Sequence, residues 1–250
     1  MQGPMAPDPK QQIADTYTAA ADSFEATPLA FWKHFGERTV QRSQLSPGAI
    51  VLDVCCGAGG SAIPAAHAVA PTGRVIGVDL APGLLNLARA KAVPNAEFRH
   101  ADFEQVYFRP ATFDVVVCVF GIFFFEDMSA ALQKMWRFLR PGGTLAITVW
   151  GPRAFAPLDD IFPGPHRWTR LAAPGSVEKL FADSGIPAAE VTYEDYTQPL
   201  ASPEDWWTIV NGSGFRGKVT PETKDTLRAA CLAIPSRSVP LPVTYAIARR

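Results

Sequence analysis

The chain has 250 residues, 48% of them hydrophobic and 19% charged, a balance that fits a folded globular protein with a sizeable core. Its formal net charge of −1 argues against a surface that grips nucleic acid, and no stripe of basic residues with interleaved aromatics is present. The longest apolar run, residues 115–125, is far shorter than the ~20 residues that a membrane-spanning helix needs.

Cysteine spacing and the N-terminus both indicate a cytoplasmic protein without a bound metal. Cys55 and Cys56 are adjacent, whereas Cys118 and Cys231 stand apart, so no C-x-x-C spacing for a metal site or a disulfide framework exists. Reduced thiols are the expected state. Residues 1–10 contain three prolines, no cationic start and no apolar stretch, so we expect a disordered N-terminus and no signal peptide.

Two helices are predicted before the first strand. Residues 11–25 have helical composition, and Pro28 interrupts them. A second helix is expected over residues 29–45, and the Ser-Pro-Gly sequence at 46–48 ends it. We expect residues 11–45 to form a helical lid over whatever the rest of the chain binds.

Residues 49–60, A-I-V-L-D-V-C-C-G-A-G-G, combine a buried strand with a glycine-bearing turn, and a helix is predicted from Ser61. Gly57 and Gly59 lack a Cβ, so they can take positive φ and let a ligand approach the backbone. The helix start supplies unpaired N–H groups and a positive dipole end. Asp53 places an acceptor-only carboxylate beside the turn. This arrangement is suited to a nucleotide-like ligand.

A second strand over residues 74–79 ends in Asp79. Asp79 follows Asp53 at close to the roughly 20-residue spacing at which a strand-end acid meets a ribose. A carboxylate there can accept hydrogen bonds from both ribose hydroxyls.

Strands and helices continue to alternate along the middle of the chain. We expect further elements in the order helix, strand, strand, helix and strand, at residues 82–92, 96–100, 113–120, 127–139 and 143–150. Arg140-Pro141-Gly142-Gly143 is predicted to be a tight turn. Repeated β-α-β units predict an α/β fold whose parallel sheet has helices on both faces.

The composition changes after residue 150. Residues 151–176 are rich in prolines and aromatics, which favours a cover segment, and a short helix is expected over residues 177–183. Strands over residues 190–198 and 239–248 are predicted to form a long-range hairpin with a helical insertion, at 203–210 and 221–234, across its tip.

Five motifs in order resemble class I S-adenosylmethionine-dependent methyltransferases over roughly residues 11–150. They are V-L-D-V-C-C-G-A-G-G, V-I-G-V-D-L, F-R-H-A-D-F-E, F-D-V-V-V-C and L-R-P-G-G-T-L. The Cys-Cys pair is similar to the ubiquinone and menaquinone biosynthesis C-methyltransferases and their small-molecule relatives. The F-G-I-F-F-F segment at 120–125 and the W-W-T-I-V-N-G-S-G-F segment at 206–215 depart from the quinone enzymes, which suggests a substrate of this chain's own.

The resemblance implies a doubly wound, mostly parallel, seven-stranded Rossmann-like sheet with an antiparallel last strand. It implies one domain over residues 11–250, in which residues 49–150 bind the cofactor, residues 151–235 cover the substrate and residues 239–250 form the last strand. S-adenosylmethionine is the expected cofactor, with Asp79 on its ribose and Asp102 beside its adenine. The expected cofactor-binding residues are Tyr17, Asp53, Cys55, Gly57, Ala58, Gly59, Asp79, Leu80, Asp102, Phe103, Phe120 and Gly121.

The expected reaction is methyl transfer to a small apolar or aromatic metabolite, because aromatic residues are frequent in the predicted cover. No catalytic base stands out, and His34 and His166 are the candidates. A nicotinamide-dependent oxidoreductase is an alternative, although it needs G-x-G-x-x-G where this chain has C-C-G-A-G-G. A cofactor-binding scaffold without turnover is another. The sequence leaves the oligomeric state open, including a homodimer.

Overall fold

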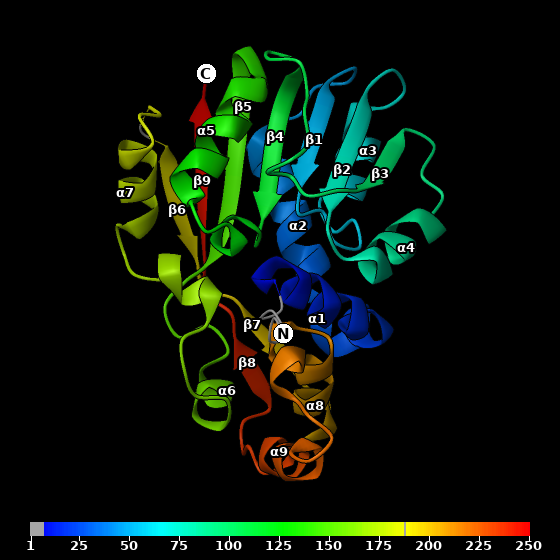
Figure 1. Cartoon of the computed structure of the whole chain (residues 1–250), viewed down its shortest axis with the longest axis vertical. Helices are drawn as coiled ribbons and strands as arrows, with labels where there is room; N and C mark the ends of the chain where they lie inside the picture. The colour runs from blue at the N-terminus through cyan, green and yellow to red at the C-terminus, as the bar shows by residue number, and fades with distance from the viewer. Residues whose placement is uncertain (1–7, 188) are drawn as a thin grey trace, which may run out of the picture.

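The computed structural model describes residues 8–187 and 189–250 and has a central seven-stranded sheet in the order β3-β2-β1-β4-β5-β9-β6 (Figure 1). β1 to β5 pair in parallel, and β9 runs antiparallel to both of its neighbours. The seven strands are β1 (Ile50–Val54), β2 (Arg74–Asp79), β3 (Ala96–His100), β4 (Phe113–Val119), β5 (Leu139–Trp150), β6 (Glu190–Glu194) and β9 (Val243–Arg249). The predicted fold class, a mostly parallel Rossmann-like sheet with an antiparallel last strand, is confirmed.

Helices cover both faces of this sheet (Figure 1). The α-helices are α1 (Pro9–Phe24), α2 (Phe31–Ser43), α3 (Ala62–Val69), α4 (Pro82–Ala90), α5 (Met128–Phe138), α6 (Ala156–Ile161), α7 (Ser176–Asp183), α8 (Glu204–Asn211) and α9 (Lys224–Leu232). Short 3-10 helices are η1 (Thr27–Leu29), η2 (Ile122–Phe124), η3 (Arg167–Leu171) and η4 (Gly214–Lys218). Among the described residues, no helix is both long and apolar enough to cross a membrane.

Apart from charged residues near their ends, such as Asp53 and Asp114, the central strands are apolar because both of their faces are covered. Val51 of β1 packs in one core with Ala65 and Val69 of α3, and its neighbour Leu52 packs in the other core with Phe138 of α5. Successive side chains of a strand point to opposite faces, so one uninterrupted hydrophobic run fills two cores. This arrangement leaves only the ends of the strands available for polar chemistry.

Two boundaries near the N-terminus differ from the predictions. α1 begins at Pro9, so the disorder predicted for residues 1–10 is wrong for residues 9 and 10, and residues 1–7 lie outside the described residues. The helix starts there because the Asp8 carboxylate accepts a hydrogen bond from the Lys10 N–H at 3.0 Å and Pro9 occupies the first helical position. The helix predicted over residues 29–45 is shorter, since η1 takes its start and Gln44 is left-handed with φ 51°.

Two predicted strand boundaries are also wrong. β5 begins at Leu139, so the expected turn at residues 140–143 lies inside the strand, where the register against β4 shifts between Phe113 and Val115.

The strands predicted over residues 190–198 and 239–248 are each broken. Their outer parts, β7 (Thr197–Pro199) and β8 (Ser238–Pro240), form a separate two-stranded sheet below the main one (Figure 1). Pro240 and Pro242 have no N–H to donate, so the main ladder does not continue through them. The predicted long-range hairpin with helices α8 and α9 across its tip is present.

α2 approaches the turn after β1 more closely than any side chain allows. A Cβ placed on Gly36 would lie 2.2 Å from the carbonyl oxygen of Gly60. Backbone atoms cannot move aside as the end of a flexible side chain can, so this contact requires glycine. Gly36 therefore fixes the distance between α2 and the glycine-rich turn.

We predict that Gly36→Ala destabilises the protein by about 1–3 kcal/mol, because the added methyl group overpacks the contact with Gly60. Gly to Ala inside an unconstrained helix stabilises it by about 0.5–1 kcal/mol, so the sign of the change is informative. Urea unfolding measures the difference. Lys33→Ala on an exposed position of the same helix is the control, and a stabilised Gly36→Ala variant would contradict the assigned contact.

Candidate functional site

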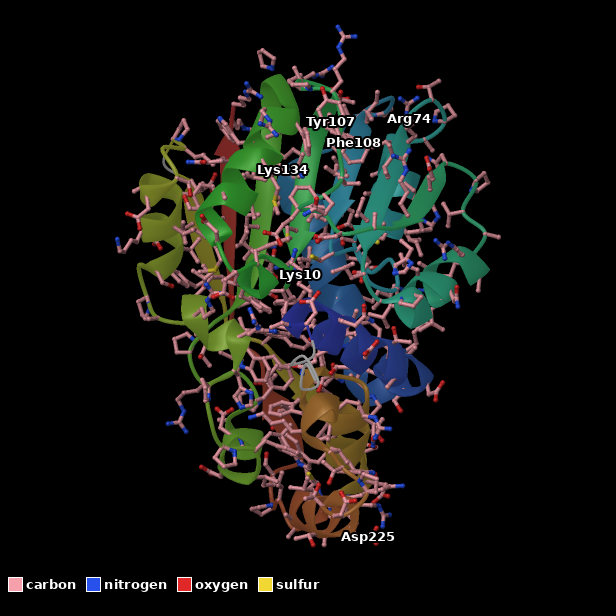
Figure 2. The ribbon with its side chains drawn as sticks, in the orientation of Figure 1. Lys10, Arg74, Tyr107, Phe108, Lys134 and Asp225 are labelled. Carbon is pink, nitrogen blue, oxygen red and sulfur yellow. The ribbon has the colours of Figure 1, made fainter. Side chains whose placement is uncertain are left out.

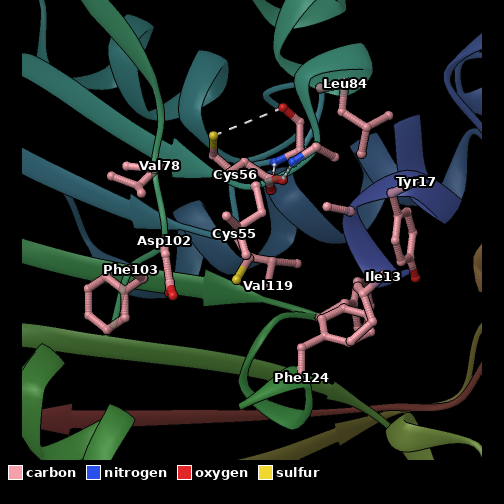
Figure 3. A pocket seen from close by; sticks show the side chains of 18 of the residues that line it. Ile13, Tyr17, Cys55, Cys56, Val78, Leu84, Asp102, Phe103, Val119 and Phe124 are labelled. Atoms are coloured by element: carbon pink, nitrogen blue, oxygen red, sulfur yellow. Dashed lines mark hydrogen bonds between the residues drawn. The ribbon is translucent and has the colours of Figure 1, made fainter. Parts of the chain in front are cut away.

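A pocket lies at the carboxyl ends of β1, β2 and β4, next to α1 (Figures 1 and 3). Its empty volume is about 1050 Å³ when counted out to its open mouth. The glycine-rich turn, the ends of β2 and β4, the loop after β3, η2 and the inner face of α1 all contribute to its lining. Carboxyl ends of parallel strands are where open α/β sheets bind ligands.

The turn after β1 has an unusual backbone that opens it toward this pocket. Cys55 has φ 59° and Gly57 has φ 52°, and both residues line the pocket. The chain reverses through a hydrogen bond from the Gly59 N–H to the Cys56 carbonyl at 2.9 Å. Only glycine takes positive φ without strain, so the turn favours glycine at position 57. At Cys55 the surrounding structure holds the backbone in the strained conformation.

Asp79 at the end of β2 holds this turn in place. Its Oδ2 accepts a hydrogen bond from the Gly57 N–H at 2.8 Å, and its Oδ1 accepts one from the Ala81 N–H at 2.8 Å. Burial raises the pKa of the Asp79 carboxyl, and the backbone donors partly oppose that rise. Each carboxylate oxygen can accept more than one hydrogen bond, so both keep capacity for a ligand.

Asp53 lies beneath the turn and does not line the pocket. It is fully buried, and its Oδ2 accepts a hydrogen bond from the Ser61 hydroxyl at 2.6 Å, while Oδ1 has no partner among the described residues. Burial raises the pKa of Asp53 to about 7. The hydrogen bond from Ser61 lowers this pKa, and the nearby charge of Asp79 adds to the rise.

A second acidic site lies in the loop after β3. Asp102 accepts hydrogen bonds from the Glu104 N–H at 2.8 Å and from the Lys10 ammonium at 2.7 Å, and Lys10 also forms an ion pair with Glu104. All three residues line the pocket. Lys10 is in the first turn of α1, and its ammonium joins this helix to the loop after β3 (Figure 2).

Aromatic rings form another part of the pocket wall. Tyr17 of α1 meets Phe124 of η2 edge to face, with ring centroids 5.6 Å apart (Figure 3). Phe24 stacks on Trp32 at 5.1 Å, and the edge of Trp32 meets Phe120 at 5.8 Å. The lining therefore combines carboxylates with aromatic rings.

The pocket brings together most of the predicted site residues. Those lining it are Tyr17, Cys55, Gly57, Ala58, Asp79, Leu80, Asp102, Phe103 and Phe120. Asp53, Gly59 and Gly121 lie outside its lining. Gly121 is packed against two thiols, since a Cβ there would lie 2.8 Å from the sulfur of Cys118 and 2.9 Å from that of Cys55.

The two candidate bases, His34 and His166, are also outside the pocket lining. His34 stacks on Tyr196 at 4.3 Å and lies 3.3 Å from a carboxylate oxygen of Glu194. His166 stacks on Trp168 at 4.0 Å, and burial lowers the pKa of His166 to about 4. Both rings are therefore engaged in packing away from the carboxylates of the pocket.

Lys10 and Glu104 were missed by the sequence analysis. Three prolines made residues 1–10 look disordered, although Asp8 followed by Pro9 is a helix-start pattern that could have placed Lys10 on α1. Glu104 is close to Asp102 in sequence, but nothing in the motif shows that a lysine 92 residues away along the chain joins the two carboxylates.

This pocket suits a ligand with hydroxyl or amino donors at one end and an apolar or cationic group at the other. The carboxylates of Asp79 and Asp102 accept hydrogen bonds, and the aromatic wall can face an apolar group or a cation. Among the described residues that line the pocket there is no histidine. The titratable groups of the described lining are therefore carboxylates, a phenol, thiols and one ammonium.

Comparisons with known proteins agree on one kind of domain. Residues 51–143 match the family described as "Methyltransferase domain". The chain is 31% identical over 143 residues to an aklanonic acid methyltransferase of Streptomyces sp. (strain C5), which covers 56% of this chain and 65% of that protein. It is 28% identical over 261 residues to a nocamycin O-methyltransferase of Saccharothrix syringae, covering 91% of this chain and 93% of that protein.

A solved structure shares the fold of the whole chain. Phosphoethanolamine N-methyltransferase 2 of Haemonchus contortus, in complex with phosphomonomethylethanolamine and S-adenosylhomocysteine, has a TM-score of 0.63 and 17% identity, covering 99% of this chain and 62% of that one. The chain spans less than two thirds of the length of the first curated relatives that it matches.

We predict that Asp53 makes stability depend on pH. Its folded pKa of about 7 lies above the value of about 3.9 expected in the unfolded chain, so the folded state holds the proton more tightly. Its stabilising contribution is therefore complete below about pH 4 and is lost as the pH rises toward about 7. Asp53→Asn, which carries no charge, should flatten this decline, by about 2–4 kcal/mol over the whole window.

Urea unfolding at several pH values between about 4 and 8 measures this effect. Asp160→Asn at an exposed carboxylate is the control and should follow the wild-type profile. An Asp53→Asn profile parallel to the wild type would contradict the buried, proton-holding state of Asp53.

Proposed function

We propose, from the premise that the chain belongs to the class I S-adenosylmethionine-dependent methyltransferases, that it transfers a methyl group to a small apolar or aromatic metabolite. The family match over residues 51–143 and the shared fold confirm the resemblance seen in the five sequence motifs. The observation that carries the proposal is the Asp79 carboxylate, which lines the pocket at the end of β2 beside the glycine-rich turn.

The residues of the pocket fit an adenosyl group. Asp79 keeps acceptor capacity on both oxygens, which matches the two adjacent hydroxyls of a ribose. Leu80 and Phe103 offer apolar surface close to a second acceptor, Asp102. The turn at Gly57 and Ala58 exposes backbone that a methionine chain can lie against.

In this proposal each of these groups has one binding role. Asp79 holds the ribose, Asp102 accepts from the adenine amino group, and Leu80 and Phe103 pack on the adenine. Gly57, Ala58 and Cys55 face the methionine end. Asp53 acts from beneath the turn by bonding Ser61, the residue before α3, and so shapes the site without lining it.

When bound, S-adenosylmethionine supplies an activated methyl group on a positively charged sulfur. Tyr17, Phe120 and Phe124 surround that end of the pocket with aromatic surface, which excludes water and favours a cation. The chain's main contribution in this proposal is alignment of the acceptor atom with the methyl group. The same aromatic surface favours an apolar or aromatic acceptor.

The proposed roles also suggest how the chain is divided. We treat residues 11–250 as one methyltransferase domain, with residues 11–45 as the lid and residues 151–235 as the substrate cover. The protein is assigned to the cytoplasm, which its four free thiols support.

Asp79→Ala should weaken binding of S-adenosylhomocysteine by about 2–3 kcal/mol, because two charge-assisted hydrogen bonds to the ribose are lost. This corresponds to roughly 30- to 150-fold in the dissociation constant. Isothermal titration calorimetry measures it. Asp127→Ala, which removes a similar carboxylate from the start of α5 away from the pocket, should leave affinity unchanged. Unchanged affinity in Asp79→Ala would refute the ribose assignment.

Methyl transfer itself is tested by incubating the protein with methyl-labelled S-adenosylmethionine and a metabolite extract. The proposal predicts a labelled small molecule that disappears in the Asp79→Ala variant. A scaffold without turnover would leave every metabolite unlabelled. Saturable binding of a nicotinamide dinucleotide, with none of S-adenosylmethionine, would instead favour an oxidoreductase.

A further inference from the structure

α1 lies across the end of the sheet (Figure 1) and forms part of the pocket wall. Its inner face contributes Lys10, Ile13, Ala14, Tyr17 and Phe24 to the lining. The helix packs mainly against α4, η4 and α8. Because α1 supplies five of the lining residues, what fastens this helix affects how easily a ligand as large as an adenosyl cofactor enters or leaves.

The first turn of α1 is fastened to the loop after β3. The Lys10 ammonium donates to Asp102 at 2.7 Å and pairs with Glu104, and Lys10 is the only cation among the described residues that line the pocket. Burial lowers the pKa of Lys10, but its bonds to both carboxylates outweigh that effect and the net pKa is raised. The ammonium therefore stays charged at neutral pH.

The other end of α1 is fastened to the glycine-rich turn. Glu25, the residue that ends α1, forms an ion pair with Lys91 at the end of α4. The Lys91 ammonium also donates to the carbonyl oxygen of Ala58 at 2.9 Å. Each end of α1 thus carries one ionic tie to a loop that lines the pocket, and the apolar contacts lie between the two ties.

We propose that Lys10 and Glu25 are positioning residues that fasten α1 over the pocket, and that breaking their ties sets the rate of cofactor exchange. This inference rests on the proposed function. The tied side chains remain partly exposed, 38% for Lys10 and 47% for Glu25, so water and salt reach both ties. Ion pairs of that exposure are weak enough to break and re-form, which a lid requires.

A lid tie differs from a direct ligand contact in its kinetics. Loss of a direct contact raises only the dissociation rate, whereas loss of a tie lets the pocket open more often and raises the association rate as well. The two rates therefore rise together, and the dissociation constant changes less than either. Salt should accelerate exchange in the wild type and have less effect once a tie is removed.

The experiment measures association and dissociation of S-adenosylhomocysteine by stopped-flow fluorescence at low and high salt, using Trp32 in the pocket lining as a reporter. Lys10→Met should raise both rates about fivefold. Lys10→Arg should restore wild-type rates, and Glu25→Gln should act in the same direction as Lys10→Met. Lys179→Met, which breaks an exposed ion pair on α7, is the matched control and should change neither rate.

Hydrogen exchange of residues 9–24 without cofactor gives an independent readout. Lys10→Met should accelerate exchange in α1 but not in α7. Unchanged rates and unchanged exchange would overturn the proposal, and a rise in dissociation alone would make Lys10 a direct contact. If the wild type fails to bind S-adenosylhomocysteine, the proposed function fails, while the exchange comparison still decides whether the ties hold α1.

Discussion

The site depends on the hydrogen bond from the Gly57 N–H to the Asp79 carboxylate, because this bond joins two adjacent strand ends into one rigid rim. β1 and β2 are paired in register as far as Val54 and Val78, and the Cys56 N–H still donates to the Val78 carbonyl at 3.2 Å. The turn leaves the sheet after Cys56. The Asp79 carboxylate fixes the chain at this point, because it accepts hydrogen bonds from the Gly57 N–H of the turn and from the Ala81 N–H. The same carboxylate therefore shapes the turn and faces the pocket.

Two kinds of packing support the site: α2 packs closely against the glycine-rich turn, and aromatic rings pack around the end of β4. Gly36 lets α2 rest directly on Gly60, so the back of the turn has no space in which to move. The ring of Phe120 stacks on Trp150 at 3.7 Å and meets Trp32. These ring contacts add to the backbone hydrogen bond from the Phe120 N–H to the Thr148 carbonyl, which holds the end of β4 against β5. The pocket thus combines a closely packed turn, carboxylates and aromatic rings. This combination suits a cofactor with a polar nucleoside and a reactive cationic end.

The sequence could predict the strands and the glycine-rich turn because their causes are local. A hydrophobic run such as residues 50–54 that ends in a glycine-bearing turn has few other readings, and the ordered motifs placed Asp79 and Asp102 correctly at strand ends. Asp53 and Asp79 are both acids at the ends of adjacent strands, so the sequence could not distinguish their roles. In the structure the Asp53 carboxylate bonds Ser61 beneath the glycine-rich turn, whereas the Asp79 carboxylate lines the pocket. The role of Lys10 depends on a contact with residues 92 or more positions away, and the break between β6 and β7 depends on partners in another part of the chain.

The most direct test of this account is a crystal structure of the protein with S-adenosylhomocysteine. The account predicts that the adenosyl group lies at the carboxyl ends of β1, β2 and β4, with both ribose hydroxyls on the Asp79 carboxylate and the sulfur facing Tyr17 and Phe120. An adenosyl group bound elsewhere, or a ribose without contact to Asp79, would contradict it.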